Sequence, residues 1–498
     1  MLARIPDHIK SIVQKFLDHH FQIYLVGGCV RNMLLEKPVK DWDLTTNATP
    51  EQILSLFPEG FYDNTFGTVG VPVSKTGELG IMNNADVQKL TSHVVEITTF
   101  RTEQNYTDSR HPGVVSWGST IEEDLERRDF TMNSIALKID ASVIASVAKQ
   151  SQEITEIATY PSASLRIPRN DGFTLVDPFD GQGDLKNHVV RAVGNPNERF
   201  KEDALRLMRA IRFATQLSFT IEEHTWNAMR EDSMLLPRIS SERIRDELLK
   251  ILASEYPYEG IMMLKNAELL QHIVPELLEG IGVSQERPGR HHTEDVFTHN
   301  VLALKFCPSN DPIVRFATLI HDVGKPRVES TDENGLVIFY NHEVMGARMA
   351  YEICERLHFS KKDRKKIVML IRWHMFTVDE HITDSAVRRF IRRVGTEHVK
   401  DMIDLRIGDR LGSGIPESRA ESWRLKKFKE RIEEQLLPAP FSIHDLVING
   451  NDIIHELAIK PSPQVGKLLQ KLFEEVDEDL ALNTREHLLK RLKELKEI

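Results

Sequence analysis

The sequence predicts an α+β protein in which a mixed-sheet head is followed by all-helical domains. Between about residue 20 and residue 140, short β-rich runs alternate with helical ones, as expected of a mixed sheet with helices packed against it. From about residue 196 onward the strand signals nearly vanish and long amphipathic patterns replace them. The length of 498 residues suits several domains, because a typical domain has roughly 150 residues.

Individual elements follow from these patterns in chain order. Residues 21–26, 94–100 and 172–176 are rich in β-branched and aromatic side chains, so each is predicted to be a strand. Residues 203–217 and 241–253 place apolar side chains three and four positions apart, which predicts helices with one buried face. The sheet is therefore expected in the head, and helices are expected after it.

Turn-forming residues divide the chain into predicted parts. Breaks near 194–196, 286–290 and 411–416 contain glycine, proline or both. The predicted parts are a head at 1–195, a helical neck at 196–285, a third domain at 286–415 and a helical tail at 416–498. Within the head, the stretch 141–171 is rich in Ala and Ser and lacks a clear period, so it is expected to be a poorly ordered inserted loop.

Composition excludes several classes of protein. With 41% hydrophobic and 28% charged residues and a mean hydropathy of −0.32, the chain is not expected to be collagen-like, wholly disordered or membrane-embedded. No apolar run approaches the roughly 18 to 20 residues that span a bilayer, and no secretory signal is recognisable, so a cytoplasmic location is expected. The cysteines form no CxxC pair, which argues against a disulfide framework or a cysteine zinc site.

The net charge of −11 sets a condition on any binding of nucleic acid. An acidic protein repels phosphate overall, so binding must rest on local basic surface. Basic runs that could form such a surface are 361–366, 388–393 and 424–431. The alternative is that each run is the solvated face of a helix.

A glycine pair opens the first candidate site. Gly27 and Gly28 follow a predicted strand and precede a helical pattern, so their backbone could approach a phosphate at a helix N-terminus, with Arg31 close by. Asp41 and Asp43 come next, and on a strand two residues at positions i and i+2 point to the same face. Their oxygen ligands suit Mg²⁺, which binds substrate phosphates during phosphoryl transfer. Taken alone, the glycine pair could also be a tight turn without a ligand.

Further residues could complete this site. Glu96 lies in a predicted strand and could supply a third carboxylate, although an exposed glutamate on an edge strand would give the same pattern. The adjacent Arg127 and Arg128 are suited to the oxygens of a triphosphate. Asp129 and Asn133 follow them, and these two could equally be caps or turn formers.

The helix expected from residue 203 carries side chains that could read a nucleobase. Asp203 and Arg206 are one turn apart, so they offer an acceptor and a fork of donors to the edge of a base. Arg209 lies beside them, whereas Arg212 is expected to drift toward the far side of the helix. The alternative is an ordinary surface ion pair between residues i and i+3.

Together these segments resemble the class II tRNA nucleotidyltransferase and poly(A) polymerase family of the polymerase-β superfamily. The resemblance covers nearly the whole chain, through Gly-Gly-x-x-Arg, Asp-x-Asp, Glu-x-Thr-Thr-x-Arg, Arg-Arg-Asp-Phe-Thr-x-Asn and Glu-Asp-x-x-Arg in that order. It implies a nucleotidyltransferase head in which Asp41 and Asp43 hold Mg²⁺ and act in catalysis with Glu96. The residues implied to bind the nucleotide are Gly27, Gly28, Arg31, Arg128, Asp203, Arg206, Arg209 and Arg212, and the Glu-Asp-x-x-Arg helix is implied to select CTP or ATP.

A second candidate site lies in the third predicted part. The adjacent His321 and Asp322, expected on one helix and joined by the distant His299 and Asp409, give mixed nitrogen and oxygen ligation that suits a divalent transition metal. This pattern resembles the HD phosphohydrolase superfamily. The resemblance implies a complete ligand set of His299, His321, Asp322, His342, His374 and Asp409, binding Mn, Ni, Co or Fe. The alternative for any one histidine is a hydrogen-bonded core residue.

The expected function is the addition of CCA, from CTP and ATP, to the 3′ end of tRNA, with an additional phosphohydrolase activity in the HD domain. The helical tail is implied to bind tRNA. Three alternatives stay open: a poly(A) polymerase of the same family, an enzyme that adds only CC or only A, and a hydrolase whose head only binds RNA. The sequence does not indicate the oligomeric state.

Overall fold

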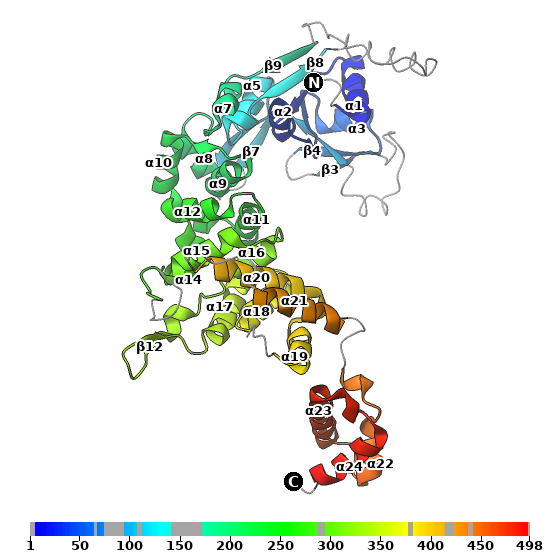
Figure 1. Cartoon of the computed structure of the whole chain (residues 1–498). Coiled ribbons are helices and arrows are strands. Elements are labelled where there is room, and N and C mark those ends of the chain that lie inside the picture. The colour runs from blue at the N-terminus through cyan, green and yellow to red at the C-terminus, as the bar shows by residue number, and fades with distance from the viewer. Residues whose placement is uncertain are drawn as a thin grey trace, which may run out of the picture. The chain divides into compact units, whose positions relative to one another are not determined.

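The computed structural model describes residues 5–63, 67–73, 94–106, 112–140, 172–285, 294–376, 382–413, 423–436 and 442–496. The chain divides into two compact units, residues 1–273 and 274–498 (Figure 1). The four parts predicted from the sequence are finer than this division and stay a prediction. The loop predicted at 141–171 lies outside the described residues.

The first unit contains a seven-stranded sheet in the order β3-β4-β5-β2-β1-β8-β9. Its strands are β1 Ile23–Val26, β2 Asp43–Thr46, β3 Phe61–Asp63, β4 Thr68–Pro72, β5 Val94–Thr99, β8 Ala136–Ile139 and β9 Phe173–Val176. The sheet is mixed because β2 and β5 run parallel, whereas the other neighbours pair antiparallel. The predicted mixed-sheet head and its three predicted strands are therefore confirmed.

Short helices connect and flank the strands of this sheet. They are α1 Asp7–Asp18, α2 Gly28–Leu34, α3 Pro50–Leu56, α5 Ile121–Glu126 and α7 Gly181–Asn187. A separate antiparallel hairpin is formed by β6 Arg101–Tyr106 and β7 Pro112–Trp117. Helix α2 begins directly after β1, so the turn between them lies at the end of a central strand. This turn positions the first candidate site.

The rest of the first unit is mostly helical, as predicted. Its helices are α8 Pro196–Glu202, α9 Leu205–Leu217, α10 Glu223–Glu231, α11 Ser241–Leu252, α12 Pro257–Asn266 and α13 Leu270–Ile273. Helix α9 packs against α11 and α12, with its apolar face buried. The exception is a short parallel pair of β10 Val189–Val190 and β11 Thr220–Ile221, which ties this region to the end of the head.

The described residues of the second unit are also mostly helical, with a hairpin of β12 Ser330–Thr331 and β13 Val337–Ile338. Its helices are α14 Pro275–Leu278, α15 Val296–Phe306, α16 Pro312–Leu319, α17 His342–Arg356, α18 Lys361–Trp373, α19 Asp384–Val394, α20 Val399–Leu411, α21 Trp423–Leu436, α22 Gly450–Leu457, α23 Pro463–Glu478 and α24 Arg485–Lys496. Helices α22, α23 and α24 enclose their own apolar core. Among the described residues, no helix is long and apolar enough to cross a membrane.

Arginines of the basic run at 388–393 form ion pairs between α19 and α23. Arg388 is only 5% exposed, and its Nε donates to Asp477 Oδ1 at 2.8 Å. Arg392 Nη2 donates to the other oxygen of the same carboxylate at 2.5 Å, and Arg389 pairs with Glu478. Three arginines of this run are therefore paired with acids of the tail helix, and they do not form the free basic surface considered from the sequence.

Two glycines allow α20 to lie directly against α15. A Cβ at Gly408 would lie 2.6 Å from the carbonyl oxygen of Ala303, and one at Gly412 would lie 2.5 Å from the Ala303 nitrogen. Both distances are shorter than real Cβ contacts, so a larger residue would force the helices apart. This contact sets the distance between His299 on α15 and Asp409 on α20.

We predict that Gly408→Ala lowers the free energy of unfolding by about 1–3 kcal/mol, because the added methyl group overpacks the contact between α15 and α20. The measurement is urea denaturation followed by circular dichroism. Gly466→Ala in α23 is the matched control, because a Cβ at Gly466 meets nothing within 4 Å. This control should raise stability by up to about 1 kcal/mol through helix propensity. Equal effects of the two substitutions would contradict the packing argument.

Candidate functional site

The turn between β1 and α2 passes close beneath two charged side chains of the head. Gly27 has a φ of 71°, a conformation that side-chain-bearing residues rarely adopt. A Cβ at this position would lie 2.9 Å from Arg128 Nη1 and 3.8 Å from Asp43 Oδ2. The position therefore favours glycine both for its backbone angle and for the approach of Arg128, and the predicted approach of a phosphate to this backbone stays a prediction.

The carboxylates of the head are positioned by the parallel pairing of β2 and β5. Asp43 begins β2 and lies opposite Glu96 in the register of the two strands, so both side chains share one face of the sheet. Asp41 precedes the strand and is exposed, so the prediction that both aspartates lie on one strand is wrong. Burial raises the pKa of the Asp43 carboxyl above its ordinary value, although Arg128 acts in the opposite direction.

Three arginines surround the ring of Phe213 on α9. The guanidinium carbons of Arg31, Arg209 and Arg212 lie 5.1, 5.4 and 4.2 Å from the ring centroid. Burial and the neighbouring Arg212 and Arg209 together lower the pKa of Arg31 to about 10, although Asp129 acts in the opposite direction. The periodicity alone predicted that Arg212 would lie toward the far side of the helix. The structure instead places it beside the same ring as Arg209. Arg209 is paired with Asp129 and Arg212 with Glu247, so the cluster keeps an excess positive charge that an anionic ligand could neutralise.

Asp129 and Asn133 hold two of these arginines in place through a hydrogen-bond network. The sequence analysis named both residues but did not predict these contacts. Asp129 is buried and accepts from Arg209 Nε at 2.8 Å, and Arg31 Nη1 donates to Asn133 Oδ1 at 2.7 Å. Asp129 also accepts from the Asn133 amide at 3.0 Å, so the two residues bridge Arg31 and Arg209. Interaction with Arg209 and Asn133 outweighs burial and keeps the pKa of Asp129 well below its usual value.

Arg128 is supported by an acid that sequence reasoning did not single out. Asp124 is fully buried and pairs with both Arg127, at 2.7 Å, and Arg128, at 3.0 Å. Its spacing of three and four residues from the two arginines on the end of α5 is the only signal of this role. Asp124 therefore orients the guanidinium of Arg128, which lies next to Gly27.

The two predicted base-reading residues are held by different partners. Arg206 Nη1 donates to Glu202 at 2.6 Å and Nη2 donates to the carbonyl oxygen of Arg127 at 2.9 Å. Asp203 is instead paired with Arg243 of α11, whose Nη2 lies 2.7 Å from Asp203 Oδ2. The structure thus places Asp203 and Arg206 near each other but does not pair them. The role of Arg243 had no signal in the sequence, because it depends on the packing of two separate helices.

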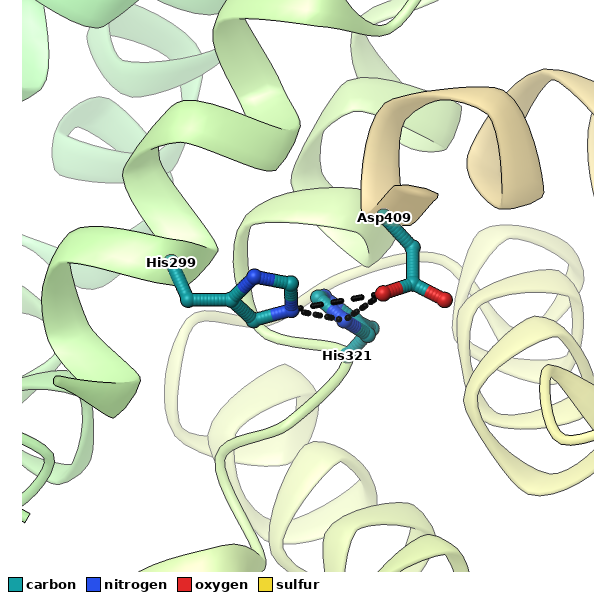
Figure 2. A group of neighbouring side chains, drawn as sticks. All are labelled: His299, His321 and Asp409. Carbon is teal, nitrogen blue, oxygen red and sulfur yellow. Dashed lines mark hydrogen bonds and ion pairs between the residues drawn. The ribbon is translucent and has the colours of Figure 1, made fainter. Parts of the chain in front are cut away.

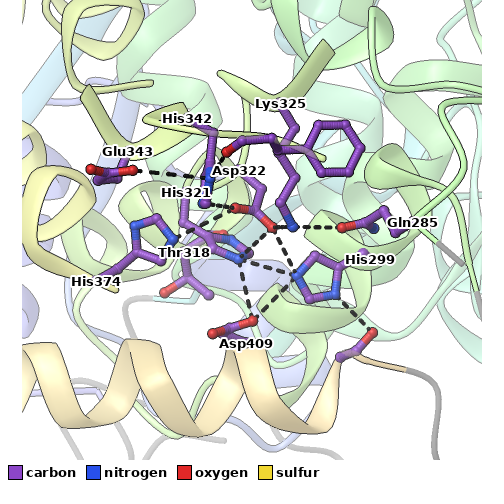
Figure 3. Close-up of polar contacts among 12 residues, drawn as sticks. Gln285, His299, Thr318, His321, Asp322, Lys325, His342, Glu343, His374 and Asp409 are labelled. Carbon is purple, nitrogen blue, oxygen red and sulfur yellow. Dashed lines mark hydrogen bonds and ion pairs between the residues drawn. The ribbon is translucent and has the colours of Figure 1, made fainter. Parts of the chain in front are cut away.

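The second candidate site is built from four histidines and two aspartates of the second unit (Figure 3). In every histidine, Nδ1 lies 2.7 to 3.1 Å from a backbone carbonyl oxygen: those of Gly412 for His299, Thr318 for His321, Phe339 for His342 and Ile371 for His374. A carbonyl can only accept, so Nδ1 carries the proton and Nε2 of the neutral ring is an acceptor. Metal-ligating histidines have this same outer hydrogen bond.

The four Nε2 atoms converge on the carboxylate of Asp322. Its Oδ2 lies 3.3 Å from Nε2 of both His299 and His321, and its Oδ1 lies 3.3 Å from His342 and 3.6 Å from His374. Asp409 Oδ1 completes the first group, at 3.3 Å from His299 and 3.5 Å from His321. Figure 2 shows His299, His321 and Asp409 pointing toward one another from α15, the loop after α16, and α20.

This cluster fits divalent cations by its own chemistry. The Nε2 atoms of His299 and His321 lie 3.1 Å apart, and two acceptor nitrogens at that distance repel unless a cation or proton lies between them. Asp322 Oδ1 and His342 Nε2 are buried and have no hydrogen-bond partner within the described part of the chain. Burial lowers the pKa of His321, but Asp322 and Asp409 outweigh this and raise it to about 10. The centre therefore attracts positive charge.

The structure corrects one expectation about this centre and adds neighbours to it. His321 and Asp322 lie in the turn after α16, which ends at Leu319, and not within the helix. Lys325, on the same turn, pairs with Asp322 and donates to Gln285 Oε1 at 2.6 Å. In the described residues, the groups of three or more potential ligand atoms within 4.8 Å of one another all belong to this centre. Asp41, Asp43 and Glu96 of the head do not form such a group.

Comparison with protein families gives matches along most of the chain. Residues 23–157 match the poly A polymerase head domain, residues 218–280 match an RNA and SrmB-binding site of polymerase A, and residues 330–492 match tRNA nucleotidyltransferase domain 2. Among solved structures, the fold is similar to a CCA-adding enzyme of Bacillus stearothermophilus in complex with CTP, with a TM-score of 0.67, 23% identity and coverage of 99% of this chain and 97% of that one. It is also similar to the Thermotoga maritima CCA-adding enzyme complexed with tRNA, with a TM-score of 0.55, 19% identity and coverage of 98% and 94%.

Two curated relatives extend the likeness. The CCA-adding enzyme of Ligilactobacillus salivarius is 28% identical over 506 residues, covering 100% of this chain and 99% of its own. The A-adding tRNA nucleotidyltransferase of Deinococcus radiodurans is 35% identical over 370 residues, covering 71% of this chain and 75% of its own. On this identity and coverage, the chain belongs to the class II tRNA nucleotidyltransferase and poly(A) polymerase family, and it is a nucleotidyltransferase.

Proposed function

We propose that this nucleotidyltransferase adds CCA, from CTP and ATP, to the 3′ end of tRNA. The observation that carries the proposal is the cradle formed by the Gly27 turn, Arg128 and the three arginines around Phe213. It offers close backbone approach and concentrated positive charge to a triphosphate, beside the carboxylate of Asp43. Relatives named as CCA-adding enzymes, which match along the full chain, support the same reaction.

Each part of this cradle has a role in the proposed reaction. Arg128 and the arginines at Phe213 bind and orient the phosphates, because planar guanidinium groups pair well with phosphate oxygens. The Gly27 turn allows the Arg128 guanidinium to lie against the backbone at the start of α2, where a phosphate could accept from Arg128 and from backbone N–H groups. Asp41 and Asp43 would hold Mg²⁺, which stabilises charge on the phosphoryl oxygens when bound. Glu96 adds a further carboxylate on the face that Asp43 shares.

Selection of the base is assigned to Asp203 and Arg206. Cytosine and adenine both present an amino donor next to a ring nitrogen that accepts, whereas uracil and guanine present a carbonyl oxygen next to an N–H group. A carboxylate and a guanidinium satisfy the first pattern and leave the second unpaired. Contacts of Arg206 with Glu202 and with the carbonyl oxygens of Arg199 and Arg127 use three of its five N–H groups, so two are left for a base.

We predict that the purified protein, given Mg²⁺ and tRNA lacking CCA, adds two residues with CTP alone and one further A when ATP is also present. Asp43→Asn should lower the rate by roughly a hundredfold or more, the scale expected when transition-state charge loses a stabilising group. Asp18→Asn, at an exposed position of α1, is the matched control and should keep full activity. The products are resolved on a sequencing gel.

Other products would assign a different member of the family. Long A tails would identify a poly(A) polymerase. Addition of A only to a tRNA that already ends in CC would identify an A-adding enzyme, like the relative from Deinococcus radiodurans. Absence of any incorporation would contradict the proposed reaction.

We also propose that the histidine and aspartate centre of the second unit binds divalent transition metal, Mn, Ni, Co or Fe, and hydrolyses phosphate esters. Four acceptor nitrogens and two carboxylates that converge in a buried cluster support this second function. His299, His321 and Asp409 would hold metal on one side of Asp322, and His342 and His374 on the other. Bound metal supplies an activated water for attack on phosphorus. Lys325 holds the Asp322 carboxylate and adds positive charge beside it.

We predict that His321→Ala removes most of the bound transition metal, because it removes one acceptor nitrogen and the hydrogen bond that orients it. Metal content is measured by mass spectrometry after loading with Mn²⁺ or Ni²⁺ and desalting. The control is His455→Ala, at an exposed position of α22. Loading should also raise the unfolding temperature of wild type and control but not of His321→Ala. Equal metal content in all three proteins would refute the assignment.

A matching activity test uses 2′,3′-cyclic nucleotides as substrates. Wild type loaded with metal should hydrolyse them, and His321→Ala should not. Retained nucleotide addition by His321→Ala would show that the two activities belong to separate sites.

A further inference from the structure

Helix α11 presents two charged side chains to the segment that carries the proposed base-selecting residues. Arg243 donates from Nη2 to Asp203 Oδ2 at 2.7 Å and from Nη1 to Asp203 Oδ1 at 3.3 Å. One turn further along α11, Glu247 pairs with Arg212 of α9 at 2.9 Å. Residues four positions apart lie on one face of a helix, so both contacts come from the face of α11 that meets α9.

These pairs differ from surface ion pairs. Glu247 is only 3% exposed, and the Asp203 and Arg243 side chains retain 20% and 27% of their exposure. Exposed ion pairs contribute little, but partly enclosed two-point contacts between guanidinium and carboxylate restrict the orientation of both groups. The contact between α11 and Asp203 is therefore suited to fixing a side chain in one direction.

The contacts of Asp203 determine the plane of its carboxylate. Oδ1 accepts from the backbone N–H of Leu205 at 3.0 Å as well as from Arg243, and among the described residues Oδ2 accepts from Arg243 alone. A carboxylate offers about four lone-pair sites, so one acceptor position remains in the plane after these three contacts. Arg243 thus sets the direction in which Asp203 can accept from a base.

Asp203 and Arg206 have separate supports. Arg206 is held by Glu202 on α8 and by the carbonyl oxygen of Arg127 at the end of the head. Asp203 is held by α11. A change at Arg243 therefore acts on the acceptor of the proposed base-selecting pair and leaves the contacts of its donor intact.

We infer that Arg243 is a positioning residue for nucleotide selection: it orients the Asp203 carboxylate toward the amino group that cytosine and adenine share. The inference rests on the proposed function and deepens it, because it names a residue that sets discrimination against uracil and guanine. When Arg243 is absent, the carboxylate can rotate away from the position where it would face the carbonyl oxygen of a wrong base. The repulsion that excludes that base is then lost.

The test compares Arg243→Gln and Arg243→Lys with wild type on tRNA lacking CCA. CTP, ATP, UTP and GTP are offered separately, and kcat/KM is measured for each. Arg243→Gln should lower the ratio of kcat/KM for CTP over UTP by about tenfold or more, the scale at which one unpaired polar contact discriminates between ligands. Arg243→Lys keeps the charge but not the two-point contact. Compared with Arg243→Gln, it should therefore recover more of the kcat/KM for CTP than of the ratio of CTP over UTP.

Arg245→Gln is the matched control, because Arg245 lies on the same helix and pairs with its neighbour Asp246. Its selectivity should equal that of wild type. A purely structural role for Arg243 would lower kcat/KM for all four nucleotides in proportion, and an unchanged ratio of CTP to UTP would overturn the inference. If Arg243→Gln does not fold, the same ratio measured with Arg243→Lys decides.

Failure of the proposed function gives a different result. It would appear in the wild-type protein, as absence of incorporation or absence of preference for CTP and ATP over UTP and GTP, and the inference would fall with it. A selective wild type with an equally selective Arg243→Gln would overturn the inference alone.

Discussion

The buried ion pair between Asp129 and Arg209 is the interaction on which the first site depends. Asp129 comes from the end of the head and Arg209 from α9, so the pair joins the sheet to the helix that carries Phe213. A buried carboxylate without a partner would be costly, and the same group also accepts from Asn133, which in turn holds Arg31. Removing Asp129 would therefore leave the surrounding guanidinium groups without their shared counter-charge.

The second site also contains buried carboxylates that need partners of opposite charge, but it supplies different partners. In the head, the buried Asp124 and Asp129 face arginines, which are permanently charged. In the second unit, Asp322 and Asp409 face imidazole rings whose outer nitrogens already donate to the backbone. Lys325 and Arg406 neutralise part of the charge, but the two acids still favour a further positive charge among the inward nitrogens, as the raised pKa of His321 indicates. This difference in partners explains why tightly grouped ligand atoms are found in the second unit while arginines line the first site.

The sequence predicted the elements better than it predicted the contacts between them. Alternation and turn residues gave the mixed sheet and the Gly27 turn, because these depend on local pattern. Asp41 was placed on a strand that begins two residues later, and His321 on a helix that ends before it, because the ends of elements depend on tertiary packing. Arg243 and its partner Asp203 are 40 residues apart, so no local spacing could connect them.

The distribution of charge explains how an acidic chain can suit an anionic substrate. Much of its basic sequence is paired within the fold, as Arg388 and Arg392 are with Asp477, and these groups contribute little positive potential. Around Phe213, Arg209 and Arg212 are paired with Asp129 and Glu247, whereas Arg31 donates to the neutral amide of Asn133. Burial and repulsion from Arg212 and Arg209 lower the pKa of Arg31, although Asp129 acts in the opposite direction. An anion bound there would relieve this repulsion, whereas one bound at a neutralised surface would gain little. Local crowding of like charge therefore favours an anion at this position, even though the net charge of the chain is −11.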